Sequence, residues 1–142
     1  MPRFVLLYHK LPSGSARASH CDLMLEAGEV LRTWSIAALP HSWGALADPS
    51  SASSSVSLAS SNIVVAEELP HHRPVYLEYE GPIGDGRGHV SRLEAGTFKT
   101  IRQSPQEWVI AISGTQIRGQ LSLQYDAETG SNWLLTFETA AN

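Results

Sequence analysis

Cysteine, basic residues and long apolar runs are all scarce in this chain, and each scarcity excludes a class of protein. The single cysteine, Cys21, excludes an internal disulfide and a multi-cysteine zinc site. Ten Lys and Arg residues against 14 Asp and Glu give a net charge of -4, which argues against tight, sequence-independent binding to duplex nucleic acid. No apolar run is long enough for a membrane-spanning helix, and His9 and Lys10 interrupt the apolar N-terminal stretch before a signal peptide could form. We therefore expect a cytoplasmic protein that has no membrane partner.

The remaining composition is typical of one globular domain. Of the 142 residues, 42% are hydrophobic and 17% are charged, which are ordinary values for a soluble protein with a core. A chain of this length can bury about two thirds of its unfolded surface around one core. We assign residues 1–142 to a single domain.

Short strand-like runs separated by turn residues recur along the chain, and no segment keeps a helical period over three turns. The expected strands are residues 4–8, 20–26, 30–36, 63–66, 75–79, 89–93, 97–102, 108–112, 117–124 and 133–137. Tight turns are expected at residues 27–29, 94–96 and 113–115. This many strands usually close on themselves, because closure removes exposed edges. The sequence therefore predicts an all-β fold, a compact antiparallel β-barrel that is closed or nearly closed.

One long irregular stretch lies between residues 40 and 62, and its residues 48–61 are rich in serine. These side chains are too small and polar to build a core, so the segment is either functional or mobile. The lack of aromatic and charged partners favours mobility over a binding role. A short helical turn at residues 42–47 is compatible with the sequence.

Residues 20–26 alternate between the two faces of an expected strand. Cys21 falls on the apolar face with two leucines, so we expect a buried, inert thiol. His20 and Asp22 fall on the opposite face, about 7 Å apart along the strand. His9 closes the preceding strand, and with this pair it would form a two-histidine, one-carboxylate set that suits Mn²⁺, Zn²⁺ or Fe²⁺. Spacing alone leaves open the alternative that each is an ordinary surface or hydrogen-bonded residue.

A second polar group precedes the expected strand at residues 75–79. His72 and Tyr76 are four residues apart and could both donate to a phosphate oxygen, while Arg73 could add a bidentate contact. Spacing alone also permits a plain polar turn at this place. The glycine-rich residues 84–88 indicate a flexible turn and not a phosphate loop, because no helix follows them.

Several stretches occur together in an order that matches one known family. They are Tyr8-His9, His20-Cys21-Asp22-Leu23-Met24-Leu25-Glu26, Leu31-Arg32-Thr33-Trp34-Ser35-Ile36, His72-Arg73-Pro74-Val75-Tyr76, Tyr79-Glu80-Gly81, Gly96-Thr97-Phe98, Ile117-Arg118-Gly119-Gln120-Leu121 and Trp133-Leu134-Leu135. Taken in order, they resemble the 3'-phosphoesterase domain of bacterial DNA ligase D, which also occurs as a stand-alone protein. The resemblance covers most of the chain.

This resemblance implies a compact β-barrel with a Mn²⁺-dependent site that removes 3'-ribonucleotides or 3'-phosphates from nucleic-acid ends. Position by position, His9, His20 and Asp22 match the family's metal ligands, and Zn²⁺ is the alternative ion. His72 and Tyr76 match the residues that contact the scissile phosphate and serve catalysis. The implied partners are a nucleic-acid 3' end or a small phosphate ester, and a separate ligase or polymerase that delivers it.

Two basic residues of the family pattern are missing here. Met24 stands where the family strand carries an arginine, and Ala38 stands where the family carries a lysine. Losing one charge-assisted phosphate contact costs about 2 to 4 kcal/mol of transition-state stabilisation, or about 10² to 10³ in rate. Arg73 or Arg17 could supply a guanidinium from another direction.

Three functions therefore remain open on the sequence. The first is a metal-dependent 3'-phosphoesterase. The second, favoured by Met24, is a catalytically weak or inactive accessory module in DNA repair that binds metal and phosphate. The third is a β-barrel that binds a small ligand without metal.

Overall fold

The structure is a computed structural model that describes residues 1–47, 56–84 and 86–140. Strands dominate it, and the two helices within the described residues are short 3-10 helices. In chain order the elements are β1 (Arg3–Lys10), β2 (His20–Ala27), β3 (Val30–Ile36), η1 (His41–Leu46), β4 (Ile63–His72), η2 (Pro74–Leu77), β5 (Gly81–Pro82), β6 (His89–Ser104), β7 (Glu107–Gly114), β8 (Arg118–Tyr125) and β9 (Asn132–Thr139). In the described part of the chain, no helix has the length and apolar character needed to cross a membrane.

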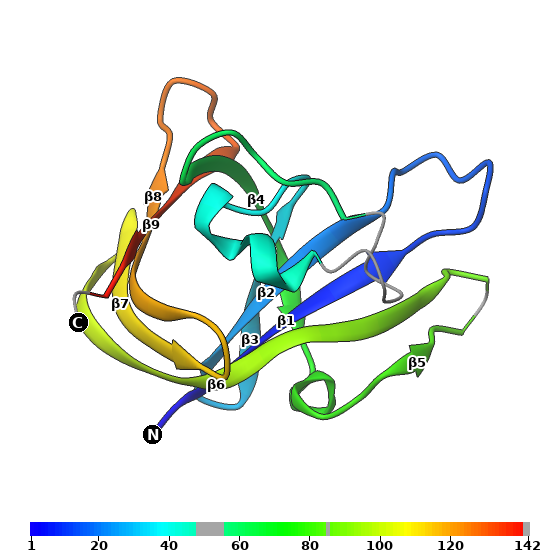
Figure 1. The fold of residues 1–142 in the computed structure, drawn as a ribbon, viewed down its shortest axis with the longest axis horizontal. Coiled ribbons are helices and arrows are strands. Elements are labelled where there is room, and N and C mark those ends of the chain that lie inside the picture. The colour runs from blue at the N-terminus through cyan, green and yellow to red at the C-terminus, as the bar shows by residue number, and fades with distance from the viewer. Residues whose placement is uncertain (48–55, 85, 141–142) are drawn as a thin grey trace.

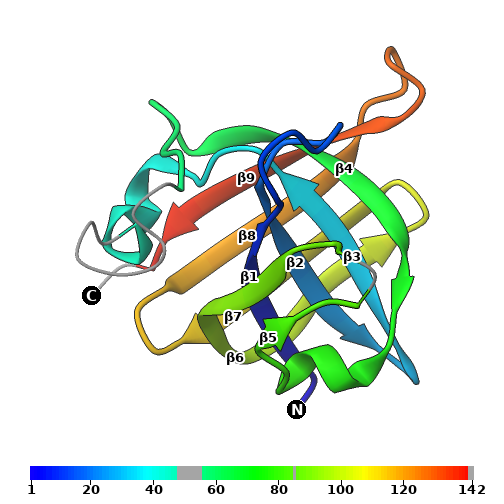
Figure 2. The same cartoon turned by 90° about the vertical axis from the view of Figure 1, so that its right-hand side faces the viewer.

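Eight strands form a ring of antiparallel pairs (Figures 1 and 2). The order around the ring is β1-β2-β3-β4-β9-β8-β7-β6, and β6 pairs with β1 to close it. The short strand β5 adds to the outer edge of β6. This arrangement confirms the predicted all-β, antiparallel barrel.

The barrel interior is filled by alternate side chains of its strands. From β1 and β2, the inward residues are Phe4, Leu6, Tyr8, Cys21, Leu23 and Leu25. Trp34 lies among them, with its ring centroid 5.5 Å from that of Trp133 in an edge-to-face arrangement. Cys21 is free and buried, and burial raises the pKa of its thiol to about 12. The expectation that Cys21 is buried is therefore confirmed, and a raised pKa disfavours the thiolate form in which a cysteine reacts.

The outward face of β1 and β2 is also buried, which the alternation pattern did not predict. Val5, Leu7 and Met24 form a second apolar cluster outside the barrel, covered by Leu77 of η2 and by Val90. Figure 2 shows η2 and β5 in front of this part of the barrel wall. The segment from η2 to β5 therefore acts as a cover over the outer face of β1 and β2.

The expected strand at residues 75–79 is wrong, because this segment contains the 3-10 helix η2. Pro74 occupies the start of the helix, where its missing N–H leaves no hydrogen bond unmade. The amide of Tyr76 then donates to the carbonyl of Arg73, and that of Glu78 to the carbonyl of Val75. The β-branched and aromatic composition suggested a strand, but the proline at its start sets a helical turn.

The expected turn at residues 94–96 is also wrong, because β6 runs without interruption through it. Residues 89–97 of β6 pair with β1, and residues 96–104 pair with β7. Gly96 lies where the two pairings meet, and a Cβ there would be 2.0 Å from the carbonyl oxygen of Ser113. Because Gly96 has no side chain, β6 and β7 can approach each other closely at this point, and the chain does not reverse here. The expected turn at residues 27–29 is confirmed, whereas the turn expected at residues 113–115 lies slightly later, because Ser113 and Gly114 still belong to β7 and the chain reverses over residues 115–117.

The irregular stretch between β3 and β4 begins with η1, which confirms the helical turn near residues 42–47. Trp43 and Leu46 of η1 belong to the interior core, and Trp43 packs edge-to-face on Phe137. Leu39, which precedes η1, pairs with Leu58, which precedes β4, in an isolated β-bridge. Most of the serine-rich segment, residues 48–55, lies outside the described residues, so its expected mobility stays a prediction.

Candidate metal centre and adjoining cavity

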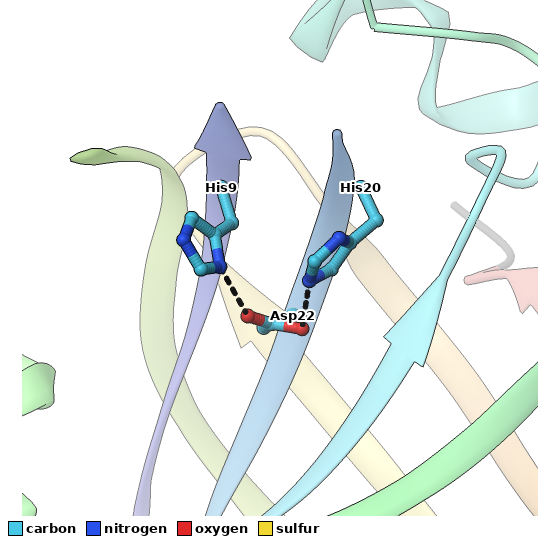
Figure 3. Close-up of side chains that lie close together, drawn as sticks. All are labelled: His9, His20 and Asp22. Carbon is cyan, nitrogen blue, oxygen red and sulfur yellow. Dashed lines mark ion pairs between the residues drawn. The ribbon is translucent and has the colours of Figure 1, made fainter. Parts of the chain in front are cut away.

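Two neighbouring strands bring His9, His20 and Asp22 together on the outer face of the barrel (Figure 3). His9 near the end of β1 lies directly opposite His20 at the start of β2. Asp22 follows two residues later, so the pleat places its side chain on the same face as His20. The cross-strand pairing therefore supplies the third side chain that the His20-x-Asp22 spacing required.

The Asp22 carboxylate lies between the two imidazoles (Figure 3). Its Oδ1 is 3.2 Å from Nε2 of His20, and its Oδ2 is 3.8 Å from Nδ1 of His9. One ligand atom from each residue falls within 4.8 Å of the others. His20 and Asp22 are 6% and 3% exposed, whereas His9 is half-buried. The three side chains thus form a group that could hold a metal ion.

Two backbone carbonyls set which imidazole nitrogen is free to act as a ligand. Nδ1 of His20 lies 2.9 Å from the carbonyl oxygen of Ala18, and Nε2 of His9 lies 2.7 Å from that of Arg87. A carbonyl oxygen only accepts, so each of these nitrogens must carry the proton and donate it. In a neutral ring the other nitrogen then has a lone pair, and in both rings that nitrogen faces Asp22. A carbonyl that fixes the ring in this way is the usual support of a metal-binding histidine.

The contact between His20 and Asp22 lacks a hydrogen bond. Neither Nε2 of His20 nor Oδ1 of Asp22 has a hydrogen-bond partner among the described residues, although both atoms are buried. A neutral imidazole nitrogen and a carboxylate oxygen repel each other at 3.2 Å unless a proton or a cation lies between them. A cation placed between the three side chains would satisfy all of these acceptors at once.

The local charges keep the carboxylate ionised. Burial raises the pKa of Asp22, but its contacts with His20 and His9 and their positive charge lower it more, so the pKa lies below its usual value. The contact with Asp22 raises the pKa of His9; burial opposes this, and the carbonyl of Arg87 adds to it. Asp22 is therefore in its metal-binding form at neutral pH, while a proton competes for His9.

A small cavity of about 90 Å³ opens next to this group. Its polar lining comes from His9, Asp22, His72, Tyr76 and Arg87. Nδ1 of His72 donates to the carbonyl of Pro70 at 2.9 Å, and the His72 ring packs edge-to-face on Tyr76 with 5.7 Å between centroids. The structure thus brings the sequence-predicted phosphate residues His72 and Tyr76 to the same cavity as the predicted metal ligands His9 and Asp22.

The positions without the family's basic residues remain apolar. Met24 lines the cavity and is buried in the outer apolar cluster, and Ala38 is a half-buried residue just after β3. Arg17 lines a separate hollow on the other side of His20, where its Nη2 donates to Oγ of Ser35 at 3.0 Å. Arg73 lines a neighbouring groove and not the cavity itself. Neither arginine replaces the missing side chain at Met24 directly.

Arg87 is the basic residue of the cavity, and sequence reasoning missed it because residues 84–88 were interpreted as a flexible turn. Its carbonyl orients His9, its Nε donates to the carbonyl of Gly84, and its side chain lines the cavity. Gly88 lets this loop reach β1, because its φ is +83° and a Cβ there would be 2.0 Å from the carbonyl oxygen of Lys10. The sequence shows an arginine between two glycines, but its place in the cavity depends on the contact of this loop with β1, which the sequence does not reveal.

No protein-family model matches this chain. No curated protein matches it at a significant level either. The likeness to the ligase D phosphoesterase domain therefore rests on the sequence motifs described above.

Proposed function

We propose that this protein is a metal-dependent phosphoesterase that acts on nucleic-acid 3' ends, with His9, His20 and Asp22 as the metal ligands and Mn²⁺ as the ion. Zn²⁺ suits the same ligands and is the second choice. The observation that supports this proposal most is the pair of carbonyl-fixed histidines that turn their free nitrogens toward one buried carboxylate. Such a donor set, with open positions toward a cavity, is suited to hydrolysis.

When bound, a divalent ion would polarise a phosphoryl oxygen of the substrate and lower the pKa of a water molecule. The residues of the chain would orient the phosphate and balance its charge. Arg87 supplies a permanent positive charge at the cavity wall, and Tyr76 supplies a hydroxyl donor. His72 keeps Nε2 free, because its Nδ1 is already bonded to Pro70, so Nε2 can exchange a proton with the phosphate or the leaving group.

A direct test is turnover of two substrates, a primer-template that ends in a 3'-ribonucleotide and one that ends in a 3'-phosphate, with added Mn²⁺. We expect hydrolysis that is lost on chelation and falls by at least about 10²-fold in His72→Ala, because a positioned proton-transfer group contributes about 10²- to 10⁴-fold. Asp22→Ala serves as the metal-site control. Equal rates for the wild type and Asp22→Ala would rule out the proposal.

The buried Met24 supports a second candidate, a weak or inactive accessory module that binds metal and phosphate. Met24 lines the cavity but offers neither charge nor a hydrogen-bond donor. We expect Met24→Arg to raise the rate by about 10-fold or more if a missing guanidinium limits the reaction. Thermal melting must accompany this test, because Met24 also packs against Leu77 in the outer cluster and an arginine there lowers stability. A folded Met24→Arg variant with no gain in rate, together with Mn²⁺ binding, would favour the accessory module.

A further inference from the structure

A second depression, of about 540 Å³, adjoins the cavity of the candidate metal centre. It lies along η2 and the loop that follows β5, and it shares Tyr76, Ile83 and Arg87 with the smaller cavity. Its volume is in the range of about 300 to 1,000 Å³ that is usual for small-molecule sites. We call it the arginine-tyrosine groove, after Arg73, Arg87, Tyr76 and Tyr79 in its lining.

The charge of the groove differs from that of the whole molecule. The chain has a net charge of -4, yet two of its ten basic residues line this groove, and no carboxylate of the described residues does. The guanidinium of Arg73 is exposed and has no hydrogen-bond or ion-pair partner in the described part of the chain. Among the described residues, the guanidinium of Arg87 makes one hydrogen bond, from Nε to the carbonyl of Gly84. As far as the described part of the chain goes, the groove therefore presents positive charge that is free to contact an anion.

The aromatic side chains of the groove are held in place. Tyr76 and Tyr79 pack edge-to-face with centroids 6.1 Å apart, and the hydroxyl of Tyr79 donates to the carbonyl of Pro82. Val75 adds an apolar surface that is 53% exposed. Fixed aromatic rings beside arginines are the combination by which proteins bind single-stranded nucleic acid, since bases stack on the rings and phosphates contact the guanidinium groups.

We propose that the arginine-tyrosine groove binds one unpaired nucleotide of a single strand, the nucleotide next to the phosphate held in the cavity. Tyr76 and Arg87 border both the groove and the cavity, so one strand can reach from one to the other. The inference rests on the proposed function, which places the 3'-terminal phosphate in the cavity. Arg73 contacts the phosphate of that nucleotide, and Tyr79 contacts its base. A duplex cannot offer an unstacked base to the groove, so the protein selects frayed or single-stranded ends.

The test is fluorescence anisotropy with a fluorescein-labelled strand of five thymidylates that carries a 3'-phosphate, in the presence of a chelator. Arg73→Ala should weaken binding by about tenfold, as expected for one charge-assisted contact, and should lower the slope of log K against log salt by about 0.7. Arg118→Ala is the matched control, because Arg118 is exposed on β8, away from the groove, and carries the same charge. It should leave both quantities unchanged.

Tyr79 allows a second pair of variants that separates stacking from structure. Tyr79→Leu should weaken binding by about fivefold or more, whereas Tyr79→Phe keeps the ring, loses the hydroxyl that donates to Pro82, and should bind more tightly than Tyr79→Leu. Equal effects of Arg73→Ala and Arg118→Ala would overturn the proposal. Equally tight binding of a blunt hairpin duplex that carries the same 3'-phosphate, or of a phosphoserine peptide of the same net charge, would also overturn it.

The chelator separates this test from the test of turnover. Binding of the single strand without metal, which Arg73→Ala weakens, supports the groove even if no hydrolysis occurs with Mn²⁺. Hydrolysis with Mn²⁺ and unaltered binding by Arg73→Ala would leave the phosphoesterase in place and remove the groove.

Discussion

At the scale of single residues, two backbone carbonyls decide the chemistry of the candidate metal centre. The carbonyls of Ala18 and Arg87 each accept a hydrogen bond from one imidazole nitrogen and so leave the other nitrogen turned toward Asp22. Ala18 precedes His20 by two residues, whereas Arg87 is far from His9 in the sequence. The first support is local and could have been expected from a bend before β2, but the second exists only in the folded chain.

The raised pKa of His9 predicts how metal affinity depends on pH. Its pKa lies above the usual 6.5, so in the metal-free protein more than half of His9 is protonated at pH 6.5, and an ion must displace that proton. Asp22 stays ionised throughout, because its pKa is lowered. As the pH is lowered from 8, the affinity for the metal ion should therefore already begin to fall before the pH reaches 6.5.

Isothermal titration with Mn²⁺ between pH 8 and pH 5.5 measures this dependence. Repeating the titration in two buffers with different ionisation heats gives the number of protons released. Affinity that stays constant over this range, with no proton release, would contradict the assignment of His9 as a ligand.

At the scale of elements, a buried carboxylate holds the turn between β7 and β8. Glu94 of β6 is 2% exposed and accepts hydrogen bonds from the amides of Thr115, Gln116 and Ile117, and from the hydroxyl of Thr115. Burial raises the pKa of Glu94, but the hydrogen bonds lower it more, so the pKa lies below its usual value. Gly114 makes room for this carboxylate, since a Cβ there would lie 2.5 Å from its carboxyl carbon.

Glu94→Gln should therefore lower the free energy of unfolding at pH 7 by about 1 to 3 kcal/mol, because buried amides lose a charged acceptor. The contribution of Glu94 is fully present above its usual pKa of 4.5 and is lost as the pH falls through its lower folded-state pKa. Urea unfolding at pH 7 and pH 3 measures both effects, with the exposed Glu128→Gln as control. Equal unfolding free energies of Glu94→Gln and wild type at pH 7 would show that the carboxylate does not hold the turn.

The same elements show what sequence patterns can and cannot predict. The alternation in β2 correctly placed Cys21 and Asp22 on opposite faces, because a strand dictates parity locally. The pattern at residues 94–96 was misleading, because a glycine that follows a strand-like run is compatible both with a turn and with a close approach between strands. The choice depends on Ser113, which lies on another strand.

At the scale of the whole molecule, the closed barrel carries the candidate metal ligands on its outer face, and the segment from η2 to β5 covers this face beside them. The interior core holds β1 and β2 in register, and that register sets His9 opposite His20. The cover segment supplies Tyr76, and the residues on either side of it, at the end of β4 and in the loop after β5, bring His72 and Arg87 to the same cavity. The outer apolar cluster around Met24 fixes the cover to the barrel.

Five residues that the fold brings together could be named from the sequence, but not the complete lining of the cavity. His9, His20 and Asp22 were named from strand alternation and motif order, and His72 and Tyr76 from their spacing and motif order. Arg87 could not be predicted, because its position depends on a loop that meets β1 through Gly88. The short helix η2 was missed for a different reason, because the β-branched and aromatic residues after Pro74 suggested a strand although the proline favours a helical turn.

The most direct test of this account is isothermal titration of the purified protein and of Asp22→Asn with Mn²⁺ and Zn²⁺. The wild type should bind one ion, and Asp22→Asn should lose at least about 100-fold in affinity, because it lacks the carboxylate between the two histidines. The variant should melt no lower than the metal-free wild type, since an amide can donate to the unpartnered Nε2 of His20. A wild-type protein that binds neither ion, or a variant that binds as tightly as the wild type, would contradict the metal centre.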